Sequence, residues 1–190
     1  MLLLVGLGNP GSNYSNTRHN IGFKIIDAIN THFKLSKQKP KFKGLLTTGN
    51  IDEKKIYAIK PLTFMNNSGT AIKELIDYFK IDAKDVIVFH DDMDIDFGKV
   101  KAKFGGSSAG HNGIESIDKF IGKDYSRVRI GIGHPKKKRK VNSHVLDDFK
   151  DDEEERIKEI TENIVKQIPT LIDKKIDLFS SKVNQNLNGI

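Results

Sequence analysis

The sequence of 190 residues contains no cysteine. This absence excludes a disulfide framework, a catalytic thiolate and every metal site that uses Cys ligands. Long hydrophobic runs are also missing: the longest one opens the chain and ends at the Gly-Asn-Pro-Gly segment of residues 8–11. This run is too short to span a membrane, and it lacks the basic lead-in and cleavage site of a signal peptide. We therefore expect a cytoplasmic protein with no membrane segment.

The net charge of +7 is unevenly distributed. Residues 1–150 carry 26 Lys and Arg against 16 Asp and Glu, a net charge of +10, whereas residues 151–190 carry 6 against 9, a net charge of −3. A basic excess confined to the body of the chain favours a polyanionic partner such as a nucleic acid.

Strand-like and helix-like segments alternate along the chain. The expected strands are residues 2–7, 44–51, 55–60, 86–90, 99–104 and 127–132, and the second and third form a hairpin. Helical spacing of apolar residues begins near residues 21, 68, 114 and 151. The pattern predicts one α/β domain over residues 1–190, with three layers and a mixed, twisted sheet flanked by helices.

The remaining segments are expected to be loops, including residues 8–20, 36–43, 61–67 and 105–113. The Lys-Lys-Lys-Arg-Lys run of residues 136–140 is expected to be a solvated loop. The C-terminal part, about 151–184, is predicted to be helical. Pro169 should break or kink this helix, because proline removes a helical hydrogen bond.

Two motifs have the residues of known signatures but not the secondary structure that those signatures require. Residues 6–11 match the dinucleotide-binding fingerprint, but helical spacing starts only at Ile21 and the expected acidic residue is missing, so we predict no cofactor. Residues 106–110 match the nucleophile elbow of serine hydrolases around Ser108, yet the helix starts too late. A serine hydrolase using Ser108 remains an alternative.

Metal motifs are incomplete as well. Asp92, Asp94 and Asp96 begin a calcium loop, but Phe97 and Lys103 occupy the positions that need glycine and a bidentate glutamate. No second histidine sits at ligand spacing from His90 on one element. We therefore predict no metal site.

Three polar segments follow predicted strands: residues 9–20, 90–92 and 107–112. They could converge on one crevice, because ligands bind beyond the carboxyl ends of strands in α/β sheets. A carboxylate of Asp91 or Asp92 that orients His19 would leave its second nitrogen free as a general base for water. The amides available to hold a substrate or an oxyanion are Asn9, Asn20, Asn66 and Asn112.

Alternation places Lys99, Lys101 and Lys103 on one face of a predicted strand. A row of cations about 7 Å apart suits a phosphate backbone. An RNA-binding protein without catalysis shares this feature and stays open as a second alternative.

Four blocks together resemble bacterial peptidyl-tRNA hydrolases. They are VGLGNPGSNYSNTRHNIGF at 5–23, PLTFMNNSG at 61–69, HDDMDIDFGKVKAKFGGSSAGHNG at 90–113 and RVRIGIGHP at 127–135. The resemblance covers residues 1–150. It implies a monomeric α/β esterase, without metal or cofactor, that cleaves the ester between a peptide and the terminal ribose of ribosome-free tRNA. Action on stalled large ribosomal subunits stays open.

The resemblance also implies roles for individual residues. His19 matches the catalytic base, Asp91 the acid that keeps it basic, and Asn9 the residue that favours an acylated amine over a free one. Asn66 and Asn112 match amides that hold the substrate. The other positions matched to substrate or tRNA binding are Tyr14, Phe64, Met65, Lys101, Lys103 and Arg129, of which the last three meet tRNA phosphate.

Overall fold

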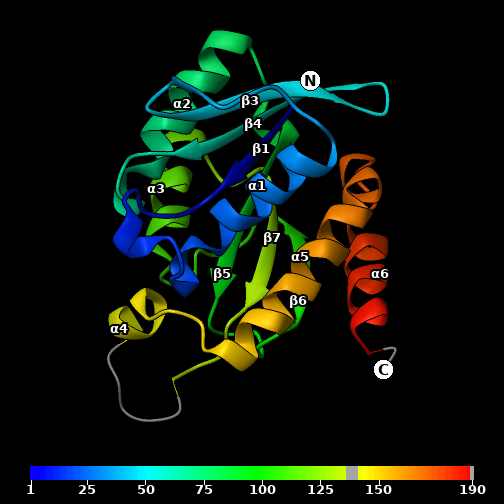
Figure 1. Ribbon diagram of the computed structural model, residues 1–190. Coiled ribbons are helices and arrows are strands. Elements are labelled where there is room, and N and C mark those ends of the chain that lie inside the picture. The colour runs from blue at the N-terminus through cyan, green and yellow to red at the C-terminus, as the bar shows by residue number, and fades with distance from the viewer. Residues whose placement is uncertain (136–140, 189–190) are drawn as a thin grey trace.

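The computed structural model describes residues 1–135 and 141–188, so the basic run at 136–140 lies outside the described residues. A sheet of seven strands lies between helices on both faces (Figure 1). The strands are β1 (Leu2–Gly6), β2 (Lys39–Lys41), β3 (Gly44–Ile51), β4 (Lys54–Pro61), β5 (Val86–Asp92), β6 (Val100–Phe104) and β7 (Ser126–Gly131). The α-helices are α1 (Ile21–His32), α2 (Ser68–Phe79), α3 (Asn112–Ile121), α4 (Val141–Leu146), α5 (Asp151–Ile172) and α6 (Ile176–Asn188). The predicted three-layer α/β fold is confirmed.

The strand order is β2-β3-β4-β1-β5-β7-β6. β1 runs parallel to β4 and β5, and β5 runs parallel to β7, whereas β2, β3 and β6 join their neighbours in antiparallel pairs. β1 is central and buried throughout, as expected for a continuous apolar run. The carboxyl ends of the four parallel strands therefore share one edge of the sheet.

Two apolar clusters fill the space between the sheet and its helices. Leu4 of β1 belongs to the cluster with residues of α1, α5 and α6, whereas Leu3 and Val5 belong to the cluster with residues of α2 and α3. This alternation is the period of two that a strand imposes on its side chains. It explains why β1 is apolar at every position.

Glycines let α1 lie directly against the sheet. A Cβ atom on Gly22 would be 2.3 Å from the Leu7 nitrogen and 2.4 Å from the Phe89 oxygen, and one on Gly6 would be 2.2 Å from the Gly22 oxygen. The first glycine of the fingerprint-like motif therefore serves the packing of helix on strand. This contact fixes where the chain between β1 and α1 must run.

The structure differs from the sequence-based expectations at three places. Residues 39–41 form the short edge strand β2 within the segment predicted as a loop, because main-chain pairing with β3 does not require apolar side chains. Pro169 lies inside α5, which continues to Ile172, and the break comes at residues 173–175. The last turn of α5 persists because Ile168, Leu171 and Ile172 are buried in the core. The short helix α4 was not foreseen.

None of the helices among the described residues is both long enough and apolar enough to cross a bilayer.

Candidate active site

The histidine predicted as the base lies in a 3₁₀ turn, η2 (Arg18–Asn20), directly before α1. The segment predicted as the loop 8–20 thus contains ordered turns. Arg18 anchors η2: its guanidinium donates to the Asp147 carbonyl at 3.2 Å and to Glu153 of α5 at 2.9 Å. His19 is therefore held in place by the C-terminal part of the chain as well as by α1.

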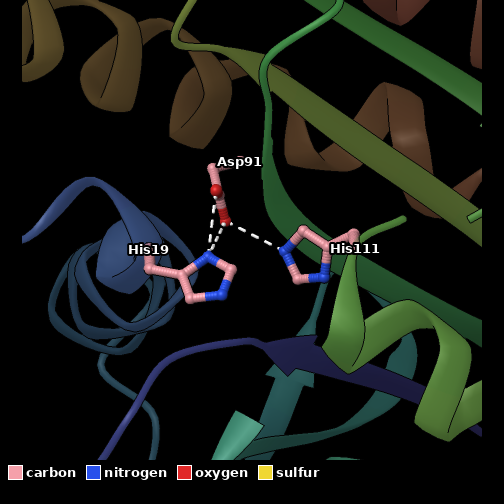
Figure 2. A group of neighbouring side chains, drawn as sticks. All are labelled: His19, Asp91 and His111. Atoms are coloured by element: carbon pink, nitrogen blue, oxygen red, sulfur yellow. Dashed lines mark hydrogen bonds and ion pairs between the residues drawn. The ribbon is translucent and has the colours of Figure 1, made fainter. Parts of the chain in front are cut away.

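Asp91 comes from β5, whose last two residues extend beyond the predicted strand end. The His19 Nδ1 atom lies 2.9 Å from Asp91 Oδ1 and 3.0 Å from Oδ2 (Figure 2). A second imidazole approaches the same carboxylate, with His111 Nε2 3.0 Å from Oδ1. The side chains of Asp91, His111 and His19 are only 2%, 8% and 9% exposed. The predicted pairing of His19 with Asp91 is present in the structure.

The charges in this cluster follow from burial and pairing. Burial alone would raise the pKa of Asp91, but the two adjacent imidazoles outweigh burial and hold that pKa well below its usual range. Burial of the ring lowers the pKa of His19, whereas the charge of Asp91 and the hydrogen bond to it raise it, and the net shift is upward. Ionised Asp91 can only accept hydrogen bonds, so His19 Nδ1 donates. His19 Nε2 is then the basic nitrogen, and it points away from Asp91 (Figure 2).

A cavity of about 350 Å³ opens beside the cluster. Its lining includes His19, Asp91, His111 and Asn112. Residues at and just after the end of β5 and residues of α4 also contribute. Asn112 is the first residue of α3 and is exposed, so its amide is accessible. The structure therefore brings the predicted base, the predicted acid and one predicted amide to one cavity.

A second predicted amide, Asn9, is held by its neighbours. The main chain of Asn9 exchanges two hydrogen bonds with the Asn20 side chain, at 2.8 and 2.9 Å, and its Oδ1 accepts from the main-chain nitrogen of Met65 at 2.9 Å. Asn20 directly follows His19, so Asn9 is attached to the turn that carries the base. Met65 is buried, whereas Asn66 is exposed in the turn η3 (Met65–Asn67).

Asn9, Met65, Asn66 and the remaining predicted positions lie outside the lining of this cavity. Lys101 and Lys103 are exposed on β6, and Lys101 lies opposite Arg129 of β7 in the antiparallel ladder. Arg129 also donates from Nε to Asp92 at 2.8 Å. We call Lys101, Lys103 and Arg129 the cationic face. Phe64 is 61% exposed, and Tyr14 is half-buried in the turn η1 (Ser12–Tyr14).

Sequence reasoning missed His111. Its segment was expected to reach the crevice, but nothing in the local pattern showed that this ring would contact Asp91. The alternative residue Ser108 lines the cavity, but its hydroxyl lies 3.4 Å from Glu115, and no imidazole of the described chain contacts it.

The same cluster is also a set of possible metal ligands. Within the described residues, the group whose ligand atoms come close enough together is His19, Asp91 and His111, within 4.8 Å of one another. His19 Nδ1 carries a hydrogen in this arrangement and offers no lone pair. A metal bound through Nδ1 would break the hydrogen bond that orients the ring, whereas the lone pair of Nε2 stays available.

Known proteins match this chain over nearly its whole length. A family model described as peptidyl-tRNA hydrolase matches residues 3–189. The chain belongs to the peptidyl-tRNA hydrolase family. A peptidyl-tRNA hydrolase of Pelagibacter ubique is 73% identical over 184 residues, which are 97% of this chain and 99% of that protein. One of Ehrlichia ruminantium is 46% identical and covers 95% of this chain and 93% of its own length.

The fold of the peptidyl-tRNA hydrolase family is also matched in solved structures. The crystal structure of peptidyl-tRNA hydrolase from Acinetobacter baumannii superposes with a TM-score of 0.90 at 33% identity, covering 97% of this chain and 94% of that one. The resemblance read from four sequence blocks is thus confirmed, and it extends into the C-terminal helices. Membership of this family makes the chain a hydrolase.

Proposed function

We propose that this chain hydrolyses the ester bond between the peptide and the terminal ribose of ribosome-free peptidyl-tRNA. The observation that carries the proposal is the buried pair of His19 and Asp91 at the wall of the cavity, in a chain of this family. The pair leaves one basic imidazole nitrogen directed away from the carboxylate. A binding protein without catalysis leaves such a pair unexplained.

In the proposed reaction, His19 Nε2 takes a proton from a water molecule whose oxygen attacks the ester carbonyl carbon. The carbonyl oxygen becomes an oxyanion, for which the Asn112 amide at the cavity wall is a suitable donor. Collapse of this intermediate breaks the bond to the ribose oxygen, which leaves and takes a proton from the His19 imidazolium. The products are the peptide carboxylate and tRNA with a free hydroxyl. Asp91 orients His19 and stabilises its charged form.

Asn9 is proposed to distinguish acylated from free amines. Its Oδ1 is occupied by the Met65 nitrogen, so the group left for a substrate is the Nδ2 donor. A donor can bond to the carbonyl oxygen of a peptide group but has no favourable contact with a protonated α-amine. Peptidyl-tRNA is therefore preferred over aminoacyl-tRNA.

The cationic face is proposed to meet tRNA phosphates. Tyr14 and Phe64 are proposed to bind tRNA, and Met65 and Asn66 to contribute to the substrate-binding cleft. Lys101 and Lys103 are exposed side by side on β6, where the ammonium groups are free to contact a backbone of negative charge. We also propose that the protein acts as a monomer.

The deciding experiment is incubation of the pure protein with peptidyl-tRNA and, separately, with aminoacyl-tRNA, both in the presence of a chelator. Release of peptide from the first, with much slower release from the second, is expected. Binding of peptidyl-tRNA without release would favour the binding-protein alternative. Loss of activity in chelator would show that the reaction needs a metal.

A further inference from the structure

The proposed reaction uses one of the two imidazoles that contact Asp91. His111 Nε2 lies 3.0 Å from Asp91 Oδ1, the oxygen that also lies 2.9 Å from His19 Nδ1 (Figure 2). The two rings come from different elements, the turn η2 and the residue before α3, and their centroids are 4.8 Å apart. One carboxylate oxygen thus joins two segments that are distant in the sequence.

The second nitrogen of His111 identifies its tautomer. His111 is the N-cap residue of α3, and its Nδ1 accepts from the main-chain nitrogens of Gly113 at 3.1 Å and Ile114 at 3.3 Å. An acceptor needs a lone pair, so the ring hydrogen lies on Nε2 and is donated to Asp91. A proton on Nδ1 would face two N–H groups and the positive end of the helix. The helix terminus therefore fixes His111 as a donor to the carboxylate.

We propose that His111 is a positioning residue for the catalytic pair, fixing the Asp91 carboxylate through Nε2 and the start of α3 through Nδ1. The proposal rests on the proposed function, because it assigns His19 as the base. The start of α3 carries Asn112, which lines the cavity. At the next residue, a Cβ atom on Gly113 would be 2.5 Å from the sulfur of Met65. α3 therefore packs closely against Met65, whose main-chain nitrogen donates to Asn9.

The donated hydrogen bond has an electrostatic consequence. A carboxylate that already accepts from His111 stabilises a proton on His19 less than an unshared carboxylate would. His111 thereby limits how far Asp91 raises the pKa of His19. This matters because a general base is protonated, and inactive, when its pKa lies far above the working pH.

The other charged groups around the two rings have partners of their own. Along the cavity, Asp92 accepts from Arg129 at 2.8 Å, and Asp94 lies 2.9 Å from His134. The ring of His90 packs 4.9 Å from that of His111, and burial lowers the pKa of His90 so far that it stays neutral. Arg127 acts on His90 and donates to the carbonyls of Gly105 and Ser107. On the far side of η2, the charged and titratable groups are Arg18, Glu153 of α5, and His144 and Asp147 in and after α4.

The test separates the two nitrogens of His111. His111→Asn keeps a favoured N-cap side chain but has no atom that can replace Nε2, whereas His111→Ala removes both contacts. The pKa of His19 is measured by NMR titration of its labelled imidazole in the substrate-free protein. Beside this, kcat/KM on peptidyl-tRNA is measured against pH. His32→Asn is the matched control, since His32 is exposed at the end of α1, remote from the cavity lining.

In both His111 variants the pKa of His19 should rise by about 0.5 to 1 pH unit. This is less than the full effect of a hydrogen bond to a charged acceptor, because the loss acts on His19 only through Asp91. The acidic limb of kcat/KM should move to higher pH by the same amount, and the control should move neither. A purely structural role would lower the melting temperature without moving the titration. An unchanged or lowered pKa of His19 in His111→Asn overturns the proposal. The NMR titration needs no turnover, so it remains decisive even if the wild type fails to hydrolyse peptidyl-tRNA.

Discussion

The buried cluster of His19, Asp91 and His111 and the exposed cationic face use charge in opposite ways. In the cluster every side chain is under 10% exposed and is hydrogen-bonded at 2.9 to 3.0 Å, so the location of each proton is determined by geometry. On the cationic face, Lys101 and Lys103 are open to solvent and to screening by salt. From this comparison we assign the chemical step to the cluster and the attraction of the substrate to the cationic face. Changes in the cluster should alter kcat and its pH dependence, whereas changes on the face should alter KM and its salt dependence.

The largest effect is expected for His19→Ala. Removal of a general base typically costs about 10²- to 10⁴-fold in rate, so kcat on peptidyl-tRNA should fall by that order. The fold should persist, because the lost ring lines a cavity, and circular dichroism melting checks this point. His32→Ala serves as the control. Near-normal turnover by His19→Ala would show that His19 is not the base. The cluster would then not control kcat, and the two regions would not differ in this way.

Asp91→Asn should give the next largest effect, with a diagnostic pH dependence. Without the carboxylate, burial alone acts on His19 and its pKa falls, from above 6.5 to below it. The acidic limb of kcat/KM should therefore move to lower pH, in contrast to the His111 variants. The plateau rate should fall about 10- to 100-fold, because the ring is still present but poorly oriented. An unchanged pH profile would show that Asp91 does not act through His19.

A smaller effect is expected when Lys101 and Lys103 are both changed to alanine. KM for peptidyl-tRNA should rise several-fold at low salt while kcat stays constant. The slope of log affinity against log salt should decrease by about 1.4 to 1.8, for two lost phosphate contacts. The matched control is Lys158→Ala with Lys166→Ala, which removes two exposed charges from α5 on the other face of the sheet. An equal change of slope in both double variants would mean that net charge, not the cationic face, attracts tRNA.

The smallest effect is expected for Ser108→Ala. Within the described residues, the hydroxyl donates only a long, exposed hydrogen bond of 3.4 Å to the Glu115 carboxylate, and it lacks the hydrogen-bonded imidazole that activates serine nucleophiles. Turnover should stay within about twofold of wild type. Strong loss of activity, together with a trapped acyl-enzyme, would instead support the serine hydrolase alternative.

Much of the site was predictable because strand topology determines it. Parallel strands end at one edge of the sheet, so polar residues after β1 and β5 had to approach one another, and His19 and Asp91 do. His111 was not predictable from the same rule. Its ring direction depends on the cap geometry of α3 and on a preceding loop in which Gly106, Ala109 and Gly110 all have positive φ. No periodicity in the sequence encodes such a path.

The local errors in the fold have a similar cause. Pro169 lowers the intrinsic preference for helix at one position, but the apolar burial of the residues around it outweighs that local cost. β2 is exposed at all three residues, so it has no alternation of apolar and polar side chains to reveal it. In both cases tertiary contacts, which the sequence pattern does not show, determine the local structure.

The most direct test of the account is whether the pKa of His19 is the pKa that controls catalysis. NMR titration of the wild-type imidazole should give a pKa above 6.5, since the charge of Asp91 and the hydrogen bond to it together outweigh burial. The acidic limb of kcat/KM for peptidyl-tRNA, measured in chelator, should have its midpoint at the same pH, with activity lost as pH falls through it. A kinetic midpoint that differs from the His19 titration, or that stays in place when Asp91→Asn moves this titration, would contradict the assignment of His19 as the base.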